Sequence, residues 1–259
     1  MSTLVLDEVA VEAPEALAAL QDALSGRRAR KPRILDLHLV PEIPLPTAAT
    51  AFSCLEPRFP AAWHQQVRQL RNRMTRFDQD AKDGGQAAIQ VVTLLSLDSA
   101  RSRKGLAGNL AFSLAAMEET KVLLVDAKVS RPDLNLHLGM GDAAGLCEAA
   151  HARREDLPDC FRRISGTQLY MLPFGRGARN QDEAVDLRGL QRLLRELRQQ
   201  FDWIVVDGPA FDTPADATLV ALCSDASLYL VEQGVDRFED LRAALKQAQG
   251  RYMLGAVLI

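Results

Sequence analysis

The chain has 259 residues, of which 47% are hydrophobic and 25% are charged, and its formal net charge is −3. These values are typical of a globular protein with a sizeable core, and the slight negative charge gives no reason to expect nucleic acid or an anionic membrane as a partner. Four isolated cysteines and the lack of an apolar run of roughly 18 residues favour the reducing cytoplasm over a secreted or membrane-spanning protein.

The first 85 or so residues differ in texture from the rest, and residues 1–60 are interpreted as an N-terminal extension or docking segment. Ala13–Leu24 has the leucine spacing of a short amphipathic helix, and a basic cluster follows at residues 27–33. That cluster is either a solvated linker or a contact with anionic lipid or an acidic partner. The proline-containing stretches Ile34–Pro46 and Phe52–Pro60 are expected to be extended, as linkers or as strands that dock elsewhere.

From residue 61 to residue 259, helical patterns alternate with apolar strands, which predicts one domain. The expected helices are Ala61–Phe77, Gly105–Met117, Asp186–Gln200 and Arg237–Gln249. The expected strands are Ile89–Leu95, Val122–Val125, Leu169–Pro173, Trp203–Val206, Ala226–Val231 and Leu254–Ile259. The predicted fold class is α/β, with a mostly parallel β-sheet flanked by helices on both faces. In such a sheet the ligand crevice lies at the carboxyl ends of the strands.

Two of these strands end in an aspartate, Asp126 and Asp207. A carboxylate at the tip of an apolar strand is costly to desolvate unless a cation or a hydrogen-bond donor meets it. One such aspartate alone could cap the following segment or pair with an arginine. Two at equivalent strand ends favour an ancestral magnesium site beside a nucleotide.

Several motifs occur in a characteristic order: Gln65-x-x-Arg68-x-x-Arg71, Val125-Asp126-Ala127-Lys128 followed by Arg131-Pro132, Gly145-Leu146-Cys147-Glu148, and Phe201-Asp202-Trp203-Ile204-Val205-Val206-Asp207-Gly208-Pro209. With these motifs the segment from residue 61 to residue 259 resembles the bacterial tyrosine kinases of polysaccharide export, the BY-kinases. These are P-loop NTPases related to MinD and ParA. The resemblance implies their fold and a cytoplasmic protein that lies against the inner membrane through a partner.

The phosphate-binding loop departs from that family, whose loop supplies two glycines, a lysine and a hydroxyl. The aligned positions here hold Ala100, Ser102, Arg103 and Lys104. A Cβ at the two glycine positions disfavours a backbone nest around phosphate, and Lys104 places a cation where Mg²⁺ needs an oxygen. Lys128 likewise replaces the second acidic residue of the Val-Asp-Ala-Asp motif.

We therefore expect no cofactor and no metal, with ATP and Mg²⁺ as the less favoured alternative. Arg103, Asp126 and Asp207 are the ancestral catalytic positions, and Lys104 stands with the two aspartates at the ancestral metal positions. Arg101, Arg103 and Lys104 could bind phosphate weakly at a helix N-terminus, could face solvent, or could neutralise the two aspartates in place of a metal.

The resemblance, together with the departures in the loop, implies a catalytically inactive BY-kinase-like protein, a pseudokinase, which scaffolds or regulates the assembly and export of a surface polysaccharide. Its expected partner is an inner-membrane chain-length (co-polymerase) protein, and no nucleic acid is expected. By analogy with the ring-forming helix of the family, Gln65, Arg68 and Arg71 are the expected oligomer interface.

Two rival functions remain open at this stage. The first is an active ATP-dependent tyrosine kinase or ATPase that works through an irregular loop, with Asp126 and Asp207 as Mg²⁺ ligands. The second is a positioning factor of the MinD/ParA type that acts on membrane or DNA. The Phe201–Pro209 signature and the Arg131-Pro132 pair favour the kinase branch over the positioning factor.

Overall fold

A computed structural model describes residues 35–44, 61–97, 105–128, 143–176, 187–232, 234–247 and 252–258 of the chain. The predicted helix Ala13–Leu24 and the extended stretch Phe52–Pro60 lie outside these ranges, as do Arg101, Arg103 and Lys104 of the loop and the Arg131-Pro132 pair. In the part of the chain that is described, no helix is both long and apolar enough to cross a bilayer.

The described strands form one eight-stranded sheet in the order β1-β4-β5-β3-β6-β2-β7-β8. Every neighbouring pair is parallel except β4 and β5, which are antiparallel. The predicted α/β class with a mostly parallel sheet is thereby confirmed. The strands are β1 Glu42–Ile43, β2 Val91–Ser96, β3 Val122–Asp126, β4 Arg162–Ile164, β5 Leu169–Leu172, β6 Trp203–Ala210, β7 Ala226–Val231 and β8 Tyr252–Leu258.

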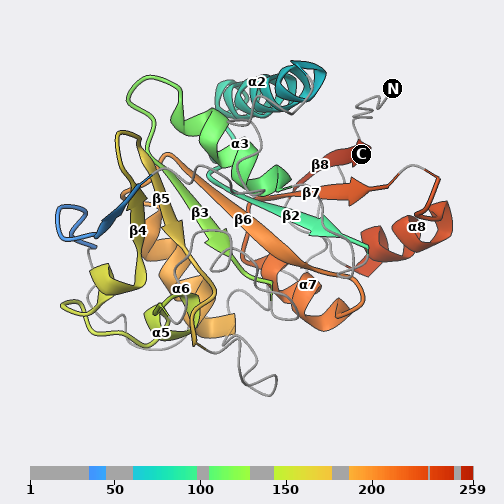
Figure 1. Cartoon of the computed structure of the whole chain (residues 1–259). Helices are drawn as coiled ribbons and strands as arrows, with labels where there is room; N and C mark the ends of the chain where they lie inside the picture. Colours follow the sequence, from blue (N-terminus) through green and yellow to red (C-terminus); the bar gives the residue numbers. More distant parts are fainter. Residues whose placement is uncertain are drawn as a thin grey trace.

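Helices cover both faces of this sheet, as Figure 1 shows. Helices α2 and α3 lie over one face, α5, α6 and α7 lie over the other, and α8 lies at the end of the sheet beside β7. The helices are α2 Ala61–Asp83, α3 Leu106–Ala115, α5 Leu146–Ala149, α6 Leu187–Leu197, α7 Pro214–Leu222 and α8 Phe238–Gln247, with a short 3-10 helix at Leu157–Cys160.

Apolar periodicity explains why the two longest core helices form where they do. In α2, buried Val67, Leu70 and Met74 recur every three or four residues and pack on the α3 side of the core. In α6, four leucines with the same spacing are buried on the opposite face, namely Leu190, Leu193, Leu194 and Leu197. The central strands are buried on both faces, which is why they read as continuous apolar runs.

Helix α2 runs to Asp83, whereas the sequence predicted an end at Phe77. Its last turns are held by tertiary contacts, which the apolar periodicity of the helix does not reveal. Ala81 is buried, and the carboxylate of Asp78 accepts a hydrogen bond from the backbone N–H of Ile89 at 2.8 Å. Helix α7 was not predicted, because it is short and lacks a polar face that would mark it as amphipathic.

The described part of the N-terminal segment, residues 35–44, packs against the sheet. Strand β1 pairs in parallel with β4, and the backbone N–H groups of Arg163 and Ser165 donate to the carbonyls of Pro41 and Ile43 at 2.9 Å each. Leu35 and Val40, also within this segment, are buried in the same core as the α6 leucines. Of the two readings of the Ile34–Pro46 stretch, a docked strand therefore describes this part. A domain boundary at residue 60 stays a prediction.

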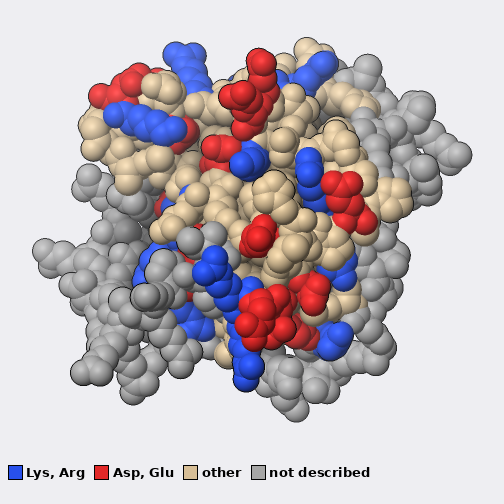
Figure 2. Space-filling model, turned by 90° about the vertical axis from the view of Figure 1, so that its left-hand side faces the viewer, with Lys and Arg blue, Asp and Glu red and all other residues tan. Residues whose placement is uncertain are grey.

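The face of the molecule on the β1 and β4 side is shown in Figure 2. Among its described residues, basic and acidic side chains are interspersed and leave apolar and neutral residues between them. One such mixed pair joins Arg163 Nη1 to Glu42 Oε1 at 3.3 Å across the β1–β4 edge. The described residues of this face form no continuous basic stripe of the kind that follows a nucleic-acid backbone.

Candidate functional site

The two predicted aspartates meet at the carboxyl edge of the sheet. Asp126 ends β3, Asp207 lies within the neighbouring β6, and the two are paired in the register of these strands. The backbone N–H of Ala127 then donates to the carbonyl of Asp207 at 2.9 Å, which extends the pairing one residue past the end of β3. The expectation that these side chains share one site at the carboxyl edge is consistent with this arrangement.

Lys128 supplies a cation to this edge. Its Nζ lies 2.6 Å from Oδ2 of Asp207, and the two side chains are only 27% and 18% exposed. The backbone N–H of Lys128 also donates to Oδ1 of Asp126 at 3.1 Å, and Asp126 is completely buried. One residue thus contacts both carboxylates, the first through its main chain and the second through its ammonium group.

This arrangement does not fit a Mg²⁺ ion at Asp207. Magnesium takes oxygen ligands in an octahedron, whereas the group facing Asp207 Oδ2 is an ammonium that cannot accept or coordinate. Among the described residues, no group of three or more His, Cys, Asp or Glu side chains is placed to hold a metal ion. The chain's own lysine therefore occupies the position opposite Asp207.

The sequence analysis noted Lys128 as a charge reversal but did not predict its ion pair. Neutralisation of the aspartates was instead considered for Arg101, Arg103 and Lys104, which lie outside the described residues. The missed signal was spacing: Lys128 follows Asp126 by two positions, and a long side chain leaving that strand tip reaches the neighbouring strand, where Asp207 lies.

Gly208 lets β6 and β2 approach closely beside this site. A Cβ at this position would lie 2.7 Å from Cγ2 of Thr93 and 2.8 Å from the carbonyl oxygen of Leu94, which no real side chain tolerates. The register of β2 and β6 also shifts between Leu94 and Ser96. The glycine after Asp207 therefore allows β6 to continue past the predicted end at Val206, as far as Ala210.

A second set of contacts fixes the neighbouring tip of β5. The carboxylate of Glu148 accepts the backbone N–H of Gly145 at 2.8 Å and that of Arg176 at 3.0 Å. The backbone at Gly145 packs directly against the chain that leaves β5. A Cβ on Gly145 would lie 2.1 Å from the carbonyl oxygen of Pro173, so only glycine fits there. Glu148, which the sequence analysis used only as part of a motif, thus joins α5 to the loop after β5.

Asp216 lies in the first turn of α7, which follows β6 at the same edge. Partial burial raises the pKa of its carboxyl above the usual value, with desolvation as the cause. A carboxylate in the first turn of a helix is otherwise favoured by the helix dipole.

The three residues predicted as an oligomer interface lie on α2, away from the carboxyl-edge aspartates. Gln65 and Arg68 are exposed, whereas Arg71 is half-buried. The Arg71 guanidinium donates to the carbonyl of Ser113 in α3 at 3.1 Å. Arg71 therefore ties α2 to its own domain, and a role of this helix in assembly stays a prediction.

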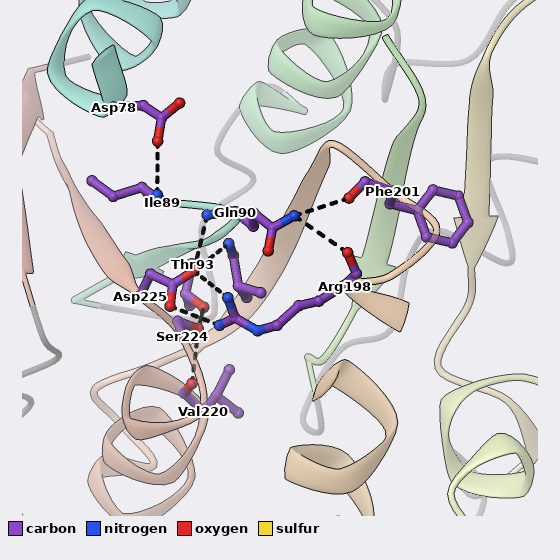
Figure 3. A network of polar contacts seen from close by, with 10 residues as sticks. Asp78, Ile89, Gln90, Thr93, Arg198, Phe201, Val220, Ser224 and Asp225 are labelled. Carbon is purple, nitrogen blue, oxygen red and sulfur yellow. Dashed lines mark hydrogen bonds and ion pairs between the residues drawn. The ribbon is translucent and has the colours of Figure 1, made fainter. Parts of the chain in front are cut away.

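The opposite, amino edge of the sheet carries a dense polar network, shown in Figure 3. Two nitrogens of the Arg198 guanidinium donate to the two oxygens of Asp225, each at 2.7 Å. The same carboxylate accepts the backbone N–H groups of Gln90 and Val91 at 2.9 Å each. Nearby, Thr93 and Ser224 share a hydrogen bond between hydroxyls. This network joins α6, β2 and the start of β7 and has a structural role.

A mostly parallel sheet covered by helices on both faces is the fold of the MinD and BY-kinase P-loop NTPases, as two solved structures show. The kinase domain of the Escherichia coli tyrosine kinase ETK superposes with a TM-score of 0.68 over 80% of this chain and 78% of that domain, at 18% identity. The cell division protein MinD of Aquifex aeolicus superposes with a TM-score of 0.52 over 65% of this chain and 68% of its own, at 20% identity.

The solved structures show the fold, and the amino-acid sequence also shows the family. The family described as cellulose biosynthesis protein BcsQ matches residues 89–252, which is well over half of the chain, and the chain belongs to this family. Its relatives include the succinoglycan biosynthesis transport protein ExoP of Rhizobium meliloti, which is 27% identical over 56% of this chain. The chain spans only 19% of the length of ExoP. The resemblance to a BY-kinase-like domain of polysaccharide biosynthesis is thereby confirmed.

Proposed function

We propose that this domain is a catalytically inactive member of its family that scaffolds or regulates the assembly and export of a surface polysaccharide. The single observation that supports inactivity is the ion pair between Lys128 and Asp207 at 2.6 Å. An active relative needs a metal beside this carboxylate, and a tethered ammonium competes for the same oxygen. The sequence adds Arg103 and Lys104 at the loop positions where the BY-kinases have a lysine and a hydroxyl.

In this proposal the lysine performs the structural part of the task of a bound metal. It lowers the cost of placing two carboxylates opposite each other on paired strands, one of which is completely buried. The strand tips then hold their arrangement without nucleotide, and the surface that a partner would contact is formed at all times. Scaffolding needs only that surface, whereas phosphoryl transfer needs a positioned metal and nucleotide.

The proposed partner is an inner-membrane chain-length (co-polymerase) protein, and the proposed location is the cytoplasmic side of that membrane. This rests on the polysaccharide-export proteins among the relatives, of which ExoP is described as a transport protein of succinoglycan biosynthesis. Self-association through Gln65, Arg68 and Arg71 of α2 is part of the same proposal.

An active kinase or ATPase is the second candidate, and one observation favours it. Asp126 and Asp207 are both retained, and they lie in register on neighbouring strands. If Lys128 moved away from Asp207, a metal carried by a nucleotide could take the place of its ammonium beside this carboxylate.

Thermal unfolding with millimolar ATP or ADP, with and without Mg²⁺, distinguishes the two candidates. A ligand at roughly 100 times its Kd stabilises the native state by about 2.7 kcal/mol, which is plain in a melting curve. We expect no Mg²⁺-dependent shift for the natural protein, and no phosphate release or autophosphorylation. Asp207→Asn is the matched variant: a Mg²⁺-dependent shift that this substitution abolishes, together with turnover, would refute inactivity.

Binding to the chain-length protein of the same bacterium tests the scaffold directly. The two purified proteins should bind in detergent with the same Kd whether nucleotide is present, absent or removed by apyrase. Binding that requires ATP would contradict the proposal, as would no binding at any concentration below about 100 μM, an upper bound for a specific contact at membrane-surface concentrations.

A further inference from the structure

The apolar stripe of helix α8 is longer than the surface on which the helix packs. Leu241 and Leu245 join the cluster around Tyr229 of β7. Phe238 lies three and seven positions before these two leucines and therefore on the same side of the helix. It is nevertheless 73% exposed. The first residue of α8 thus continues the inward-facing stripe beyond the core, into solvent.

Val235, in the turn before α8, is 43% exposed and forms an apolar patch with Phe238. Hydrogen bonds within the turn hold it in place. The backbone N–H groups of Val235 and Asp236 donate to the carbonyl of Glu232 at 3.2 and 3.0 Å. The backbone N–H of Glu232 in turn donates to a carboxylate oxygen of Asp236 at 2.6 Å. A turn closed in this way presents its apolar side chain with little further ordering cost on binding.

The apolar patch lies at the carboxyl edge of the sheet. Strand β7 ends at Val231, and the chain passes from its tip through a short loop into α8, as Figure 1 shows. Only β2 separates β7 from β6, which carries Asp207. The two strands are therefore roughly 10 Å apart in the plane of the sheet. The patch thus adjoins the edge that the Lys128–Asp207 ion pair occupies.

Acidic side chains lie beside the apolar patch. Glu239 and Asp240 are exposed in the first turn of α8. Asp212 is exposed just before α7, the helix that packs next to α8 and also begins at the carboxyl edge. From residue 210 to residue 241 the chain has one basic residue, Arg237. This charge disfavours an anionic lipid surface or a nucleic acid as the occupant and favours a partner that carries lysine or arginine.

We propose that the apolar patch of Val235 and Phe238 binds a basic segment of an inner-membrane protein, next to one of its membrane spans on the cytoplasmic side. Such segments carry an excess of lysine and arginine. An apolar side chain of the segment packs on Phe238, and its basic residues lie beside Glu239 and Asp240. The inference rests on the proposed function for the kind of partner, and it adds where this domain holds that partner and by which chemistry.

Binding to the purified chain-length protein of the same bacterium, in detergent, tests the apolar part of this contact. Phe238→Ser should weaken binding about tenfold or more, because it truncates a central aromatic anchor. Phe238→Leu keeps an apolar side chain and should bind within about threefold of the natural chain. Leu39→Ser is the control, because Leu39 is 64% exposed and lies near β1, at the other end of the sheet. An unchanged melting temperature verifies that each variant is folded.

A second pair of variants tests the charge. The double variant Glu239→Gln/Asp240→Asn should bind about three- to tenfold more weakly at low salt and should lose less affinity than the natural chain when salt is added. Glu118→Gln/Glu119→Gln removes the same charge at exposed positions between α3 and β3 and should bind as the natural chain does. Synthetic peptides of the cytoplasmic residues that adjoin each membrane span of the chain-length protein should reproduce this order of affinities.

The outcomes separate this inference from the proposed function. No binding of the natural chain would refute the proposed scaffold together with the inference. Binding that Phe238→Ser and Glu239→Gln/Asp240→Asn leave unchanged would overturn the inference alone. Self-association of the chain that requires Phe238 would also overturn it, as would Phe238-dependent sedimentation with phosphatidylglycerol vesicles. In those cases a second copy or a lipid surface occupies the patch.

Discussion

The two edges of the sheet each carry an ion pair, and the pairs differ in how the rest of the chain holds them. At the amino edge, Asp225 accepts both arms of Arg198 and two backbone N–H groups, so each carboxylate oxygen has a fixed partner. At the carboxyl edge, the ammonium of Lys128, which is on a flexible stem, lies 2.6 Å from one oxygen of Asp207. The first pair joins three elements of the fold, and the second lies at the edge where we propose that a lysine takes the place of a metal.

The amino-edge pair should therefore be the more costly to break. Asp225→Ala removes the partner of Arg198 and leaves the N–H groups of Gln90 and Val91 without an acceptor. We expect a loss of about 3–5 kcal/mol in the free energy of unfolding, measured by urea denaturation.

Asp202→Ala is the control for that substitution. Asp202 lies near the same edge, is exposed, and accepts one backbone N–H, that of Lys121, at 2.8 Å. Its loss should cost about 0.5–1.5 kcal/mol. Equal losses for Asp202→Ala and Asp225→Ala would show that the Arg198 fork adds nothing to stability.

Lys128→Met should have the next largest effect. It removes the cation beside Asp207 but keeps most of the apolar length of the side chain, and we expect a loss of about 1–2 kcal/mol at pH 7 because the pair is only partly buried. Lys121→Met, at the exposed position just before β3, is the matched control and should change stability by less than about 0.5 kcal/mol. A Lys128→Met protein as stable as the natural one would remove the argument that this lysine replaces a metal.

The smallest effect concerns Cys223, at the amino-edge end of α7. Burial raises the pKa of its thiol from its ordinary value near 9 to about 12. Below pH 9 the thiol is neutral in both the folded and the unfolded protein, so its ionisation does not lower the free energy of unfolding there. Above pH 9 the unfolded thiol ionises first, and stability falls as pH rises toward 12, by at most about 1.4 kcal/mol per pH unit.

Urea unfolding at pH 8, 9, 10 and 10.5 measures that slope, and Cys223→Ala should reduce it. An unchanged slope in the variant would mean that the thiol is accessible to solvent and that the amino edge is less tightly closed than its hydrogen bonds imply.

The sequence predicted the central sheet well, because strands buried on both faces leave apolar runs that can be recognised without knowing their neighbours. It also predicted that Asp126 and Asp207 share one edge, since parallel strands bring their carboxyl ends together. It did not predict β4, because two of the three residues of this short strand are the charged Arg162 and Arg163, so the strand has no apolar run. The periodicity of a single segment carries no information about such pairing.

The partner of Asp207 shows the same limit within the site. Lys128 was recognised as a departure from a motif, but the atom that it contacts belongs to a strand almost 80 positions later in the chain, and only the strand order makes them neighbours. Arg198 and Asp225 were missed for the same reason. The sequence around a strand shows which residues lie at its end, whereas the partners of those residues depend on which strands are adjacent in the sheet.

The docking of residues 35–44 affects how this protein can be produced in pieces. A recombinant fragment that began at residue 61, where the family resemblance begins, would lack β1 and would leave the N–H groups of Arg163 and Ser165 without their acceptors. It would also uncover the apolar surface that Leu35 and Val40 bury. An open strand edge beside an apolar patch is a template for aggregation, so a soluble fragment should begin before Leu35.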